Sequence, residues 1–387
     1  MTLEPGAQGA TPDATPSDAM ARIIDAALAR HDGWLPFDQF MALALYAPGA
    51  GYYAHGSRKF GHLPGSGSDF VTAPELSPLF GQTLAVQVQE ALAHSGTDEV
   101  WEFGAGSGAL AEQLLGALED GQGGGVARYT IVDLSGALRE RQRERLAPFG
   151  DKVRWVSELP QRIEGVVVGN EVLDAMPVKL LHRVKGVWHE RGVVRAGHDA
   201  RGGGRAADGA LGWEDRPTDL RPPVDIGGPH DYLTEIHPQA RAWVATLAER
   251  LARGAAFLID YGFPESEYYH PQRHMGTVMC HQAHRSDSNP LVAVGDKDIT
   301  AHVDFTGIAL AAQDAGLTVL GYTSQARFLL NCGLGPRMDA APLAERALAA
   351  RLVHEHEMGE FFKVLGLAAG EPWEPVGFAH GDRSHTL

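Results

Sequence analysis

The chain has 387 residues, 44% of them hydrophobic and 21% charged, as is ordinary for a soluble globular protein, and is long enough for one large domain with insertions. No apolar run approaches the roughly 20 residues of a membrane span, so we expect no membrane insertion. The formal net charge of −16 argues against a nucleic-acid partner, because phosphate binding depends on clustered Lys and Arg.

The N-terminal quarter is predicted to be a tail followed by helices and loops. Residues 1–19 are expected to be a disordered tail, and they carry neither the basic start nor the apolar core of a targeting signal. Residues 20–97 are expected to pack on the core as a helical and loop segment. Because the chain also has only two cysteines, we expect a cytoplasmic protein.

A strand, a glycine-rich turn and a helix come next. The apolar residues 100–103 lead into the turn 104–108, and apolar residues at helical spacing follow it. Glycines let a chain turn sharply and let a ligand lie against bare main chain at a helix N-terminus. A second apolar strand ends in Asp133, whose carboxylate can accept hydrogen bonds from both ribose hydroxyls of a nucleoside. These features predict a nucleoside-binding domain.

The rest of the chain alternates strands and helices, which predicts an α/β fold of the Rossmann-like type, with a mostly parallel twisted sheet and helices on both faces. We expect the core at 98–333, with large insertions at about 175–254 and 263–300, and a helical C-terminal extension at 334–387.

Two finer predictions concern the first insertion. Residues 178–184 and 187–194 resemble a hairpin with Lys185-Gly186 at its turn. Residues 196–230 are rich in Gly, Pro, Asp and Arg and are expected to be a flexible surface segment.

Polar residues follow several predicted strands. In an open α/β sheet the ligand lies beyond the carboxyl ends of the strands. Gly104, Asp133, Asn170 with Glu171, and Asp260 all stand at such ends, so we expect them to converge on one crevice.

The charge of Glu102 favours one nucleoside over another. A carboxylate two residues before the first glycine would repel a pyrophosphate by roughly 1–4 kcal/mol, whereas the ammonium and sulfonium of S-adenosylmethionine would be attracted to it. The turn also fits the dinucleotide fingerprint through Ala109, so a dinucleotide stays an alternative. We predict S-adenosylmethionine as the cofactor. The residues expected to bind it are Glu102, Gly104, Ala105, Gly106, Ser107, Gly108, Asp133 and Asn170.

Six segments resemble the MidA-type methyltransferases, whose mitochondrial members support respiratory complex I assembly. They are residues 43–53, 69–81, 102–108, 170–178, 260–273 and 298–305. The resemblance implies methylation of a protein arginine, in a core complex I subunit for those members. It also places Pro74 and Glu75 at the cofactor. One departure is Asp133, where the family usually has Glu.

An arginine acceptor would need carboxylates. Its guanidinium is cationic and delocalised, so its nitrogen lone pair is poorly available. Two carboxylates can bind it bidentately and draw positive charge away from the attacking nitrogen. Glu171 and Asp174 are the leading pair, although Asp174 could instead cap a turn. Glu235 is a further carboxylate expected to face substrate, or else a helix-entry charge, and Asp260 with Tyr261 is expected to line the acceptor channel.

Other classes of function stay open from the sequence. The chain could be an assembly chaperone that binds S-adenosylmethionine without catalysis, or a small-molecule methyltransferase. His270 and His274 have a spacing found in zinc sites, but Arg273 between them opposes a cation, so we expect no metal. The expected partner is a protein with an accessible arginine, and a homodimeric state is left open.

Overall fold

The computed structural model describes residues 16–54, 71–120, 125–133, 135–196 and 210–387. Most of the predicted disordered tail lies outside these residues. Its last four residues, however, belong to helix α1 (Pro16–Arg30), so the helix begins earlier than the pattern predicted.

The central sheet has the strand order β15-β16-β10-β5-β2-β3-β4, and the short strand β14 pairs with β10. Every pairing is parallel except those of β16, which runs antiparallel to both neighbours. The inner strands are buried on both faces, which explains why they lack polar alternation. In chain order the strands are β2 (Glu99–Phe103), β3 (Arg128–Val132), β4 (Val153–Val156), β5 (Ile163–Asn170), β10 (Leu251–Phe263), β14 (Val303–Asp304), β15 (Thr318–Ser324) and β16 (Phe362–Ala369).

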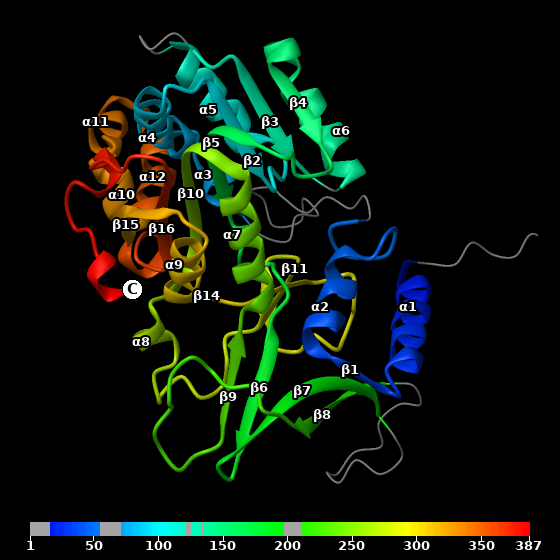
Figure 1. Ribbon diagram of the computed structural model, residues 1–387. Helices are drawn as coiled ribbons and strands as arrows, with labels where there is room; N and C mark the ends of the chain where they lie inside the picture. The colour runs from blue at the N-terminus through cyan, green and yellow to red at the C-terminus, as the bar shows by residue number, and fades with distance from the viewer. Residues whose placement is uncertain (1–15, 55–70, 121–124, 134, 197–209) are drawn as a thin grey trace, which may run out of the picture.

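Helices cover both faces of this sheet, which confirms the predicted Rossmann-like architecture (Figure 1). One apolar core packs the sheet against α4 (Leu79–Ser95), α5 (Ala109–Asp120), α10 (Gln325–Asn331), α11 (Leu334–Ala340) and α12 (Leu343–Val353). A second packs its other face against α7 (Pro238–Arg250) and α9 (Phe305–Asp314). Helix α6 (Gly136–Arg145) joins β3 to η1 (Ala147–Lys152) and β4.

The C-terminal segment differs from its prediction. Residues 334–387 were expected to form a helical extension, but β16 lies within them and inserts between β10 and β15. The α/β core therefore extends beyond residue 333. The pattern could not reveal this, because strand order depends on pairing between residues far apart in the sequence.

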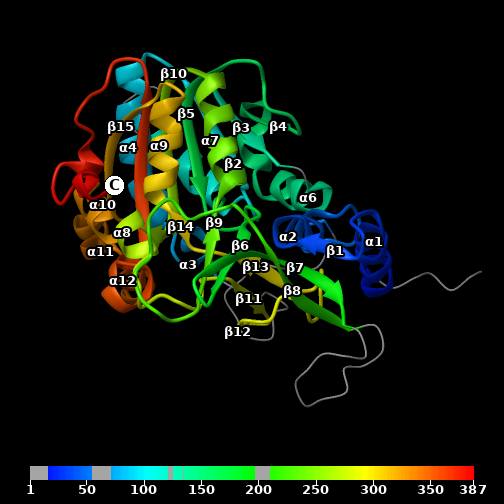
Figure 2. The same cartoon turned by 60° about the horizontal axis from the view of Figure 1, so that its bottom comes forward.

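The insertions and the N-terminal helices build a second lobe, which lies below the central sheet in Figure 1 and again at its lower end in Figure 2. We call it the insertion lobe. It contains α1, α2 (Phe37–Tyr46), a sheet of β1 (Trp34–Pro36), β6 (Lys179–Val184), β7 (Val187–Arg195), β8 (Leu211–Pro217) and β9 (Tyr232–Ile236), and a smaller sheet of β11 (Met279–Gln282), β12 (Arg285–Asp287) and β13 (Asp298–Thr300). All of these elements except β12 contribute to one apolar core.

Two predictions for this lobe have different outcomes. The β6–β7 hairpin is confirmed, and its turn residues Lys185 and Gly186 have φ values of 49° and 83°, as a type I′ turn requires. The prediction of a flexible segment at 196–230 is wrong in part, because residues 211–217 form β8, which pairs with β7. Residues 197–209 lie outside the described residues.

Two short helices complete the frame of the site. They are α3 (Ala73–Leu76), which lies at the beginning of α4, and α8 (Glu265–Tyr268), which follows β10. Among the described residues, no helix is both long and apolar enough to cross a membrane.

Candidate active site

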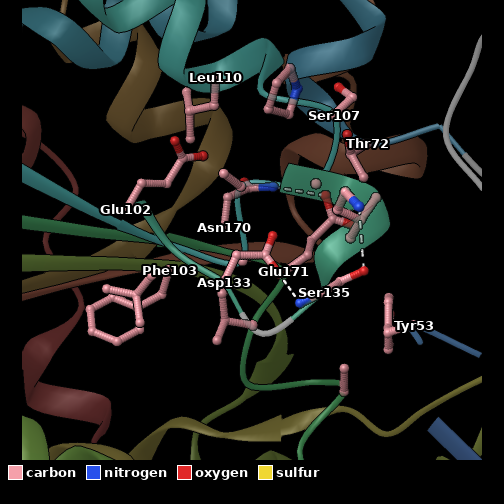
Figure 3. A pocket seen from close by; sticks show the side chains of 18 of the residues that line it. Tyr53, Thr72, Glu102, Phe103, Ser107, Leu110, Asp133, Ser135, Asn170 and Glu171 are labelled. Atoms are coloured by element: carbon pink, nitrogen blue, oxygen red, sulfur yellow. Dashed lines mark hydrogen bonds between the residues drawn. The ribbon is translucent and has the colours of Figure 1, made fainter. Parts of the chain in front are cut away.

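A cavity of about 470 Å³ lies at the carboxyl ends of β2, β3 and β5 (Figure 3). Its volume falls within the range of about 300–1,000 Å³ that is typical of small-molecule sites. The insertion lobe closes one side of it with Tyr46, Tyr53 and Asp298. The site is therefore built between the two lobes.

The glycine-rich turn forms part of the wall. Gly104, Gly106 and Gly108 have φ values of 63°, 52° and 83°, a region that residues with a Cβ rarely adopt. Gly104, Ala105, Gly106 and Ser107 line the cavity, as predicted, whereas Gly108 is not among the lining residues and instead leads into α5. The turn thus brings bare main chain and a helix N-terminus to the ligand.

Glu102 lies at the cavity with almost no exposure to solvent, at 2%. Its Oε2 accepts a hydrogen bond of 2.7 Å from the Tyr129 hydroxyl. Burial raises the pKa of Glu102 to about 8, even though the bond from Tyr129 opposes the rise. The carboxyl group is therefore set to ionise when a cation arrives beside it.

Asp133 also lines the cavity, and a residue that the sequence did not reveal holds it there. Gln142 of α6 is fully buried, and its Nε2 donates to Asp133 Oδ2 at 2.8 Å and to the Gly106 carbonyl at 3.0 Å. Its Oε1 accepts from Trp155 Nε1 at 2.9 Å. One side chain thus ties the glycine-rich turn to the end of β3. A buried glutamine in a polar helix carries no sequence signal of this role.

Replacing Gln142 with Met keeps the volume but removes all three hydrogen bonds. We expect the affinity for S-adenosylhomocysteine to fall about thirtyfold, since at least two bonds worth about 1 kcal/mol each are lost at the site. Calorimetric titration measures this. Gln313→Met, at an exposed position of α9, is the matched control. Unchanged affinity in the Gln142 variant would show that the tie does not shape the site.

Pro74 and Glu75 of α3, which the resemblance places at the cofactor, both line the cavity. Glu75 accepts a hydrogen bond from the Ser107 hydroxyl and another from Arg145 Nη1 at 3.2 Å. Arg145 also donates to Ser107 Oγ at 2.7 Å. These bonds link α3, the glycine-rich turn and α6 at one edge of the cavity.

Glu171 follows β5 in a conformation that is rare for a residue with a side chain, with φ at 53°. Strain of this kind persists where the surroundings enforce it, often at functional sites. Glu171 lines the cavity, and its Oε1 accepts from Asn170 Nδ2 at 2.9 Å. Burial, with the nearby charge of Asp174, raises the pKa of Glu171 to about 8. Asn170 Oδ1 has no partner among the described residues.

Asp174 is 5% exposed and lines the same cavity. Burial raises its pKa, and a hydrogen bond from the Tyr261 hydroxyl opposes that rise. Its Oδ1 is buried and has no hydrogen-bond partner within the described ranges. The structure thus brings the leading acid pair to one chamber and leaves a carboxylate oxygen there without a donor.

Asp260 and Tyr261 do not line the cavity, which differs from their expected place in the acceptor channel. Asp260 is 1% exposed, and its Oδ2 accepts from the backbone amides of residues 172, 173 and 174 at 3.1, 2.8 and 3.2 Å. It therefore shapes the turn that carries Glu171 and Asp174. Tyr261 does not reach the cavity itself, and its hydroxyl donates a hydrogen bond to Asp174, which lines the cavity.

Glu235 corrects a second expectation. It lies on β9, fully buried and outside the cavity lining, rather than facing substrate. Its carboxylate accepts from the Tyr268 hydroxyl at 2.9 Å and from the backbone amides of Thr277 and Val278 at 2.7 and 3.2 Å. These bonds fasten the second insertion to β9. A sequence cannot distinguish such a carboxylate from a catalytic one, because its donors lie about 40 residues away.

Asp298 is the cavity acid that the sequence reasoning missed as a site residue. It lies at the start of β13, within one of the segments that carry the family resemblance, and this position was its only signal. No group of three His, Cys, Asp or Glu side chains that could hold a metal ion occurs in the part of the chain that the structure describes. Cys280, near the two histidines weighed above, is buried in the apolar core of the insertion lobe.

Comparison with known proteins agrees with this geometry. Residues 83–323 match the family described as "Putative S-adenosyl-L-methionine-dependent methyltransferase". The chain belongs to this family. The crystal structure of a Burkholderia thailandensis protein bound to S-adenosyl-homocysteine is 48% identical, with a TM-score of 0.89, and the match covers 99% of this chain and 100% of that one.

More distant relatives are named for their activity. The protein arginine methyltransferase NDUFAF7 homolog of Caenorhabditis elegans is 28% identical, over 80% of this chain and 75% of its own length. Human protein arginine methyltransferase NDUFAF7 is 26% identical, over 85% of this chain and 79% of its own length. The expected resemblance to the MidA-type methyltransferases is confirmed at the level of the family.

The methyltransferase cavity has the donors and acceptors that S-adenosylmethionine requires. The main chain of the glycine-rich turn at the start of α5 suits the carboxylate of the cofactor, while the carboxyl group of Glu102 suits its ammonium. Asp133 is positioned for ribose hydroxyls. Asn170 Oδ1, buried without a partner among the described residues, offers one more acceptor. The predicted cofactor is confirmed.

The raised pKa of Glu102 predicts a pH dependence of cofactor binding. An ammonium ligand favours the ionised acid, so binding releases a proton below about pH 8, and the affinity for S-adenosylhomocysteine should rise toward pH 8 and then level off. Calorimetry between pH 6 and 9 measures this. In Glu102→Gln, the part of the increase in affinity with pH that comes from ionisation of Glu102 should disappear. Tyr129→Phe should move the plateau to higher pH, because the Tyr129 bond lowers the pKa. An unaltered profile in both variants would contradict the assigned role.

Proposed function

We propose that this methyltransferase transfers a methyl group to an arginine side chain of a protein substrate. The observation that carries the proposal is the pair of carboxyl groups, half-buried Glu171 and buried Asp174, in the cavity that also holds the cofactor residues. The curated relatives named as protein arginine methyltransferases support the same acceptor. The family resemblance adds a core complex I subunit as the substrate.

The residues of the chain can serve an arginine in three ways. Bound S-adenosylmethionine supplies the electrophilic methyl group. Glu171 and Asp174 can accept hydrogen bonds from the guanidinium and fix its plane, so that one terminal nitrogen faces the methyl group. Their negative charge holds the positive charge of the guanidinium away from that nitrogen.

Proton balance assigns a further task to the pair. The new N–C bond forms as the S–C bond breaks, and the nitrogen loses one proton while the guanidinium keeps its charge. Glu171, once the bound guanidinium has caused it to ionise, can accept that proton, and its pKa of about 8 in the empty cavity makes its carboxylate a stronger base than usual.

Labelling with S-[methyl-³H]adenosylmethionine tests the acceptor. The purified enzyme is incubated with a lysate of host cells that lack its gene, and the labelled protein is hydrolysed in acid and separated by amino-acid analysis. We expect the label to elute with methylarginine. Label confined to small molecules would favour a metabolite methyltransferase, and absence of enzyme-dependent label would favour a binding protein without catalysis. Either result would contradict the proposal.

A further inference from the structure

The side of the cavity formed by the insertion lobe carries an acid that is held in a fixed orientation. Asp298 is 2% exposed, and the Tyr53 hydroxyl donates to both of its carboxylate oxygens, at 3.0 and 3.1 Å. The backbone amide of Ile299 donates to Oδ1 at 3.0 Å. Tyr53 in turn stacks on Tyr46, with ring centroids 5.6 Å apart. Figure 3 shows Tyr53 across the cavity from Glu102.

The cavity as a whole is strongly acidic. The described residues that line it include no Lys, Arg or His. Its acids are Glu75, Glu102, Asp133, Glu171, Asp174 and Asp298. Six carboxyl groups around one chamber favour a cationic ligand, because neighbouring carboxyl groups ionise together at low cost only beside positive charge.

These acids divide between two ends. At the cofactor end, Glu102 lies near the end of β2, Asp133 follows β3, and Glu75 lies beside the glycine-rich turn. Glu171, Asp174 and Asp298 form the other group. The charges of Asp174 and Asp298 both raise the pKa of Glu171. Asp174 Oδ1 is buried without a partner among the described residues. Two of these acids come from the turn after β5, and the third comes from the insertion lobe. An acceptor group placed there meets carboxylates from two lobes.

A guanidinium suits this arrangement better than an ammonium. It is planar and presents five N–H donors in a fixed fork, so it can satisfy carboxylates on more than one edge at once. Its flat face also packs well on aromatic rings such as those of Tyr46 and Tyr53. An ammonium has three donors on a single nitrogen, so it can bridge acids only over a shorter distance than a guanidinium, whose donors are spread over three nitrogens.

We propose that Asp298, oriented by Tyr53, is a specificity-determining residue that accepts hydrogen bonds from the substrate guanidinium and selects arginine over lysine. This inference rests on the proposed function, since it concerns the acceptor end of the same site. It assigns to the insertion lobe a part in choosing the acceptor, in addition to closing the cavity. The residues that bind the methyl donor belong to the core.

Binding of L-argininamide and L-lysinamide, each titrated into enzyme saturated with S-adenosylhomocysteine, tests the assignment. For the wild-type enzyme we expect argininamide to bind at least about tenfold more tightly than lysinamide. Asp298→Asn should remove most of that preference and leave the affinity for S-adenosylhomocysteine unchanged. Tyr53→Phe should reduce the preference by a smaller factor, because the carboxylate remains but loses its fixed orientation. Asp225→Asn, at an exposed acid between β8 and β9, is the matched control.

Each contrary outcome contradicts either the role of Asp298 or its dependence on Tyr53, and is distinguishable from a failure of the proposed function. Argininamide binding that is equal in wild-type enzyme and Asp298→Asn would overturn the role of Asp298, while methylarginine in the labelling assay would still support the proposed function. Equal wild-type affinities for the two amides would also overturn the inference. If Asp298→Asn loses affinity for S-adenosylhomocysteine, and so its fold, Tyr53→Phe decides: a fully retained preference for argininamide rejects the assignment.

Discussion

Glu171→Gln is expected to lower methyl transfer to protein arginine about 10²–10³-fold, the loss typical of removing one electrostatic group from an active site. The substitution keeps the size of the side chain, and the glutamine Oε1 can still accept the bond from Asn170. Only the charge and the proton acceptor are lost. The rate of methylarginine formation measures the effect, and the affinity for S-adenosylhomocysteine should change less than about twofold.

The pH profile separates a chemical role of Glu171 from a structural one. Because Glu171 must ionise to hold a guanidinium, kcat/KM of the wild-type enzyme should rise with pH toward about 8, the pKa of this group in the empty cavity. The variant should lose that contribution to the rising limb. Glu249→Gln, at an exposed position of α7, should behave as wild type. A Glu171→Gln enzyme with wild-type rate and profile would remove Glu171 from the mechanism.

Asp260→Ala is expected to lower the free energy of unfolding by about 3–5 kcal/mol, because several buried backbone amides lose their acceptor together. Those amides belong to residues 172–174 and to Tyr261, which donates to Oδ1 at 2.9 Å. Urea unfolding measures the loss. Asp314→Ala, at an exposed acid at the end of α9, should change stability by less than about 0.5 kcal/mol.

Measuring both activity and stability also distinguishes the role of Asp260 from that of Glu171. Since Asp260 lies behind the cavity wall, its loss should displace the turn that carries Glu171 and Asp174, so activity and stability should fall together. Glu171→Gln should lower activity alone. An Asp260→Ala enzyme of undiminished stability would show that the turn is held by other contacts.

The sequence was most informative where local chemistry decides the structure. The glycine-rich turn needs three positive φ angles, and the Lys185-Gly186 turn needs two, so their residues indicate their conformation directly. Buried parallel strands read as unbroken apolar runs, and the carboxyl ends of such strands meet at one edge. The fold class, the cofactor, and the convergence of Gly104, Asp133, Asn170 and Glu171, though not of Asp260, on one cavity followed from these rules.

Contacts between distant segments could not be predicted in the same way. Asp298 reaches the cavity through the insertion lobe, 245 residues from the Tyr53 hydroxyl that orients it. Asp260 was expected at the acceptor and instead binds amides 86 to 88 residues earlier in the chain. β16 joins the sheet by pairing with β10, which lies more than 100 residues earlier. An aspartate suits both a structural and a functional role, and an apolar strand suits several positions in a sheet. Only the contacts with distant residues determine which role or position it takes.

The central claim is that buried carboxyl groups hold a guanidinium beside the methyl donor. A crystal structure of the enzyme with S-adenosylhomocysteine and L-argininamide tests it most directly. We predict that the guanidinium lies in hydrogen-bond contact with Glu171 and Asp174, with one terminal nitrogen facing the sulfur of S-adenosylhomocysteine. A guanidinium bound outside the cavity, or a chamber filled by water while argininamide binds elsewhere, would contradict the account.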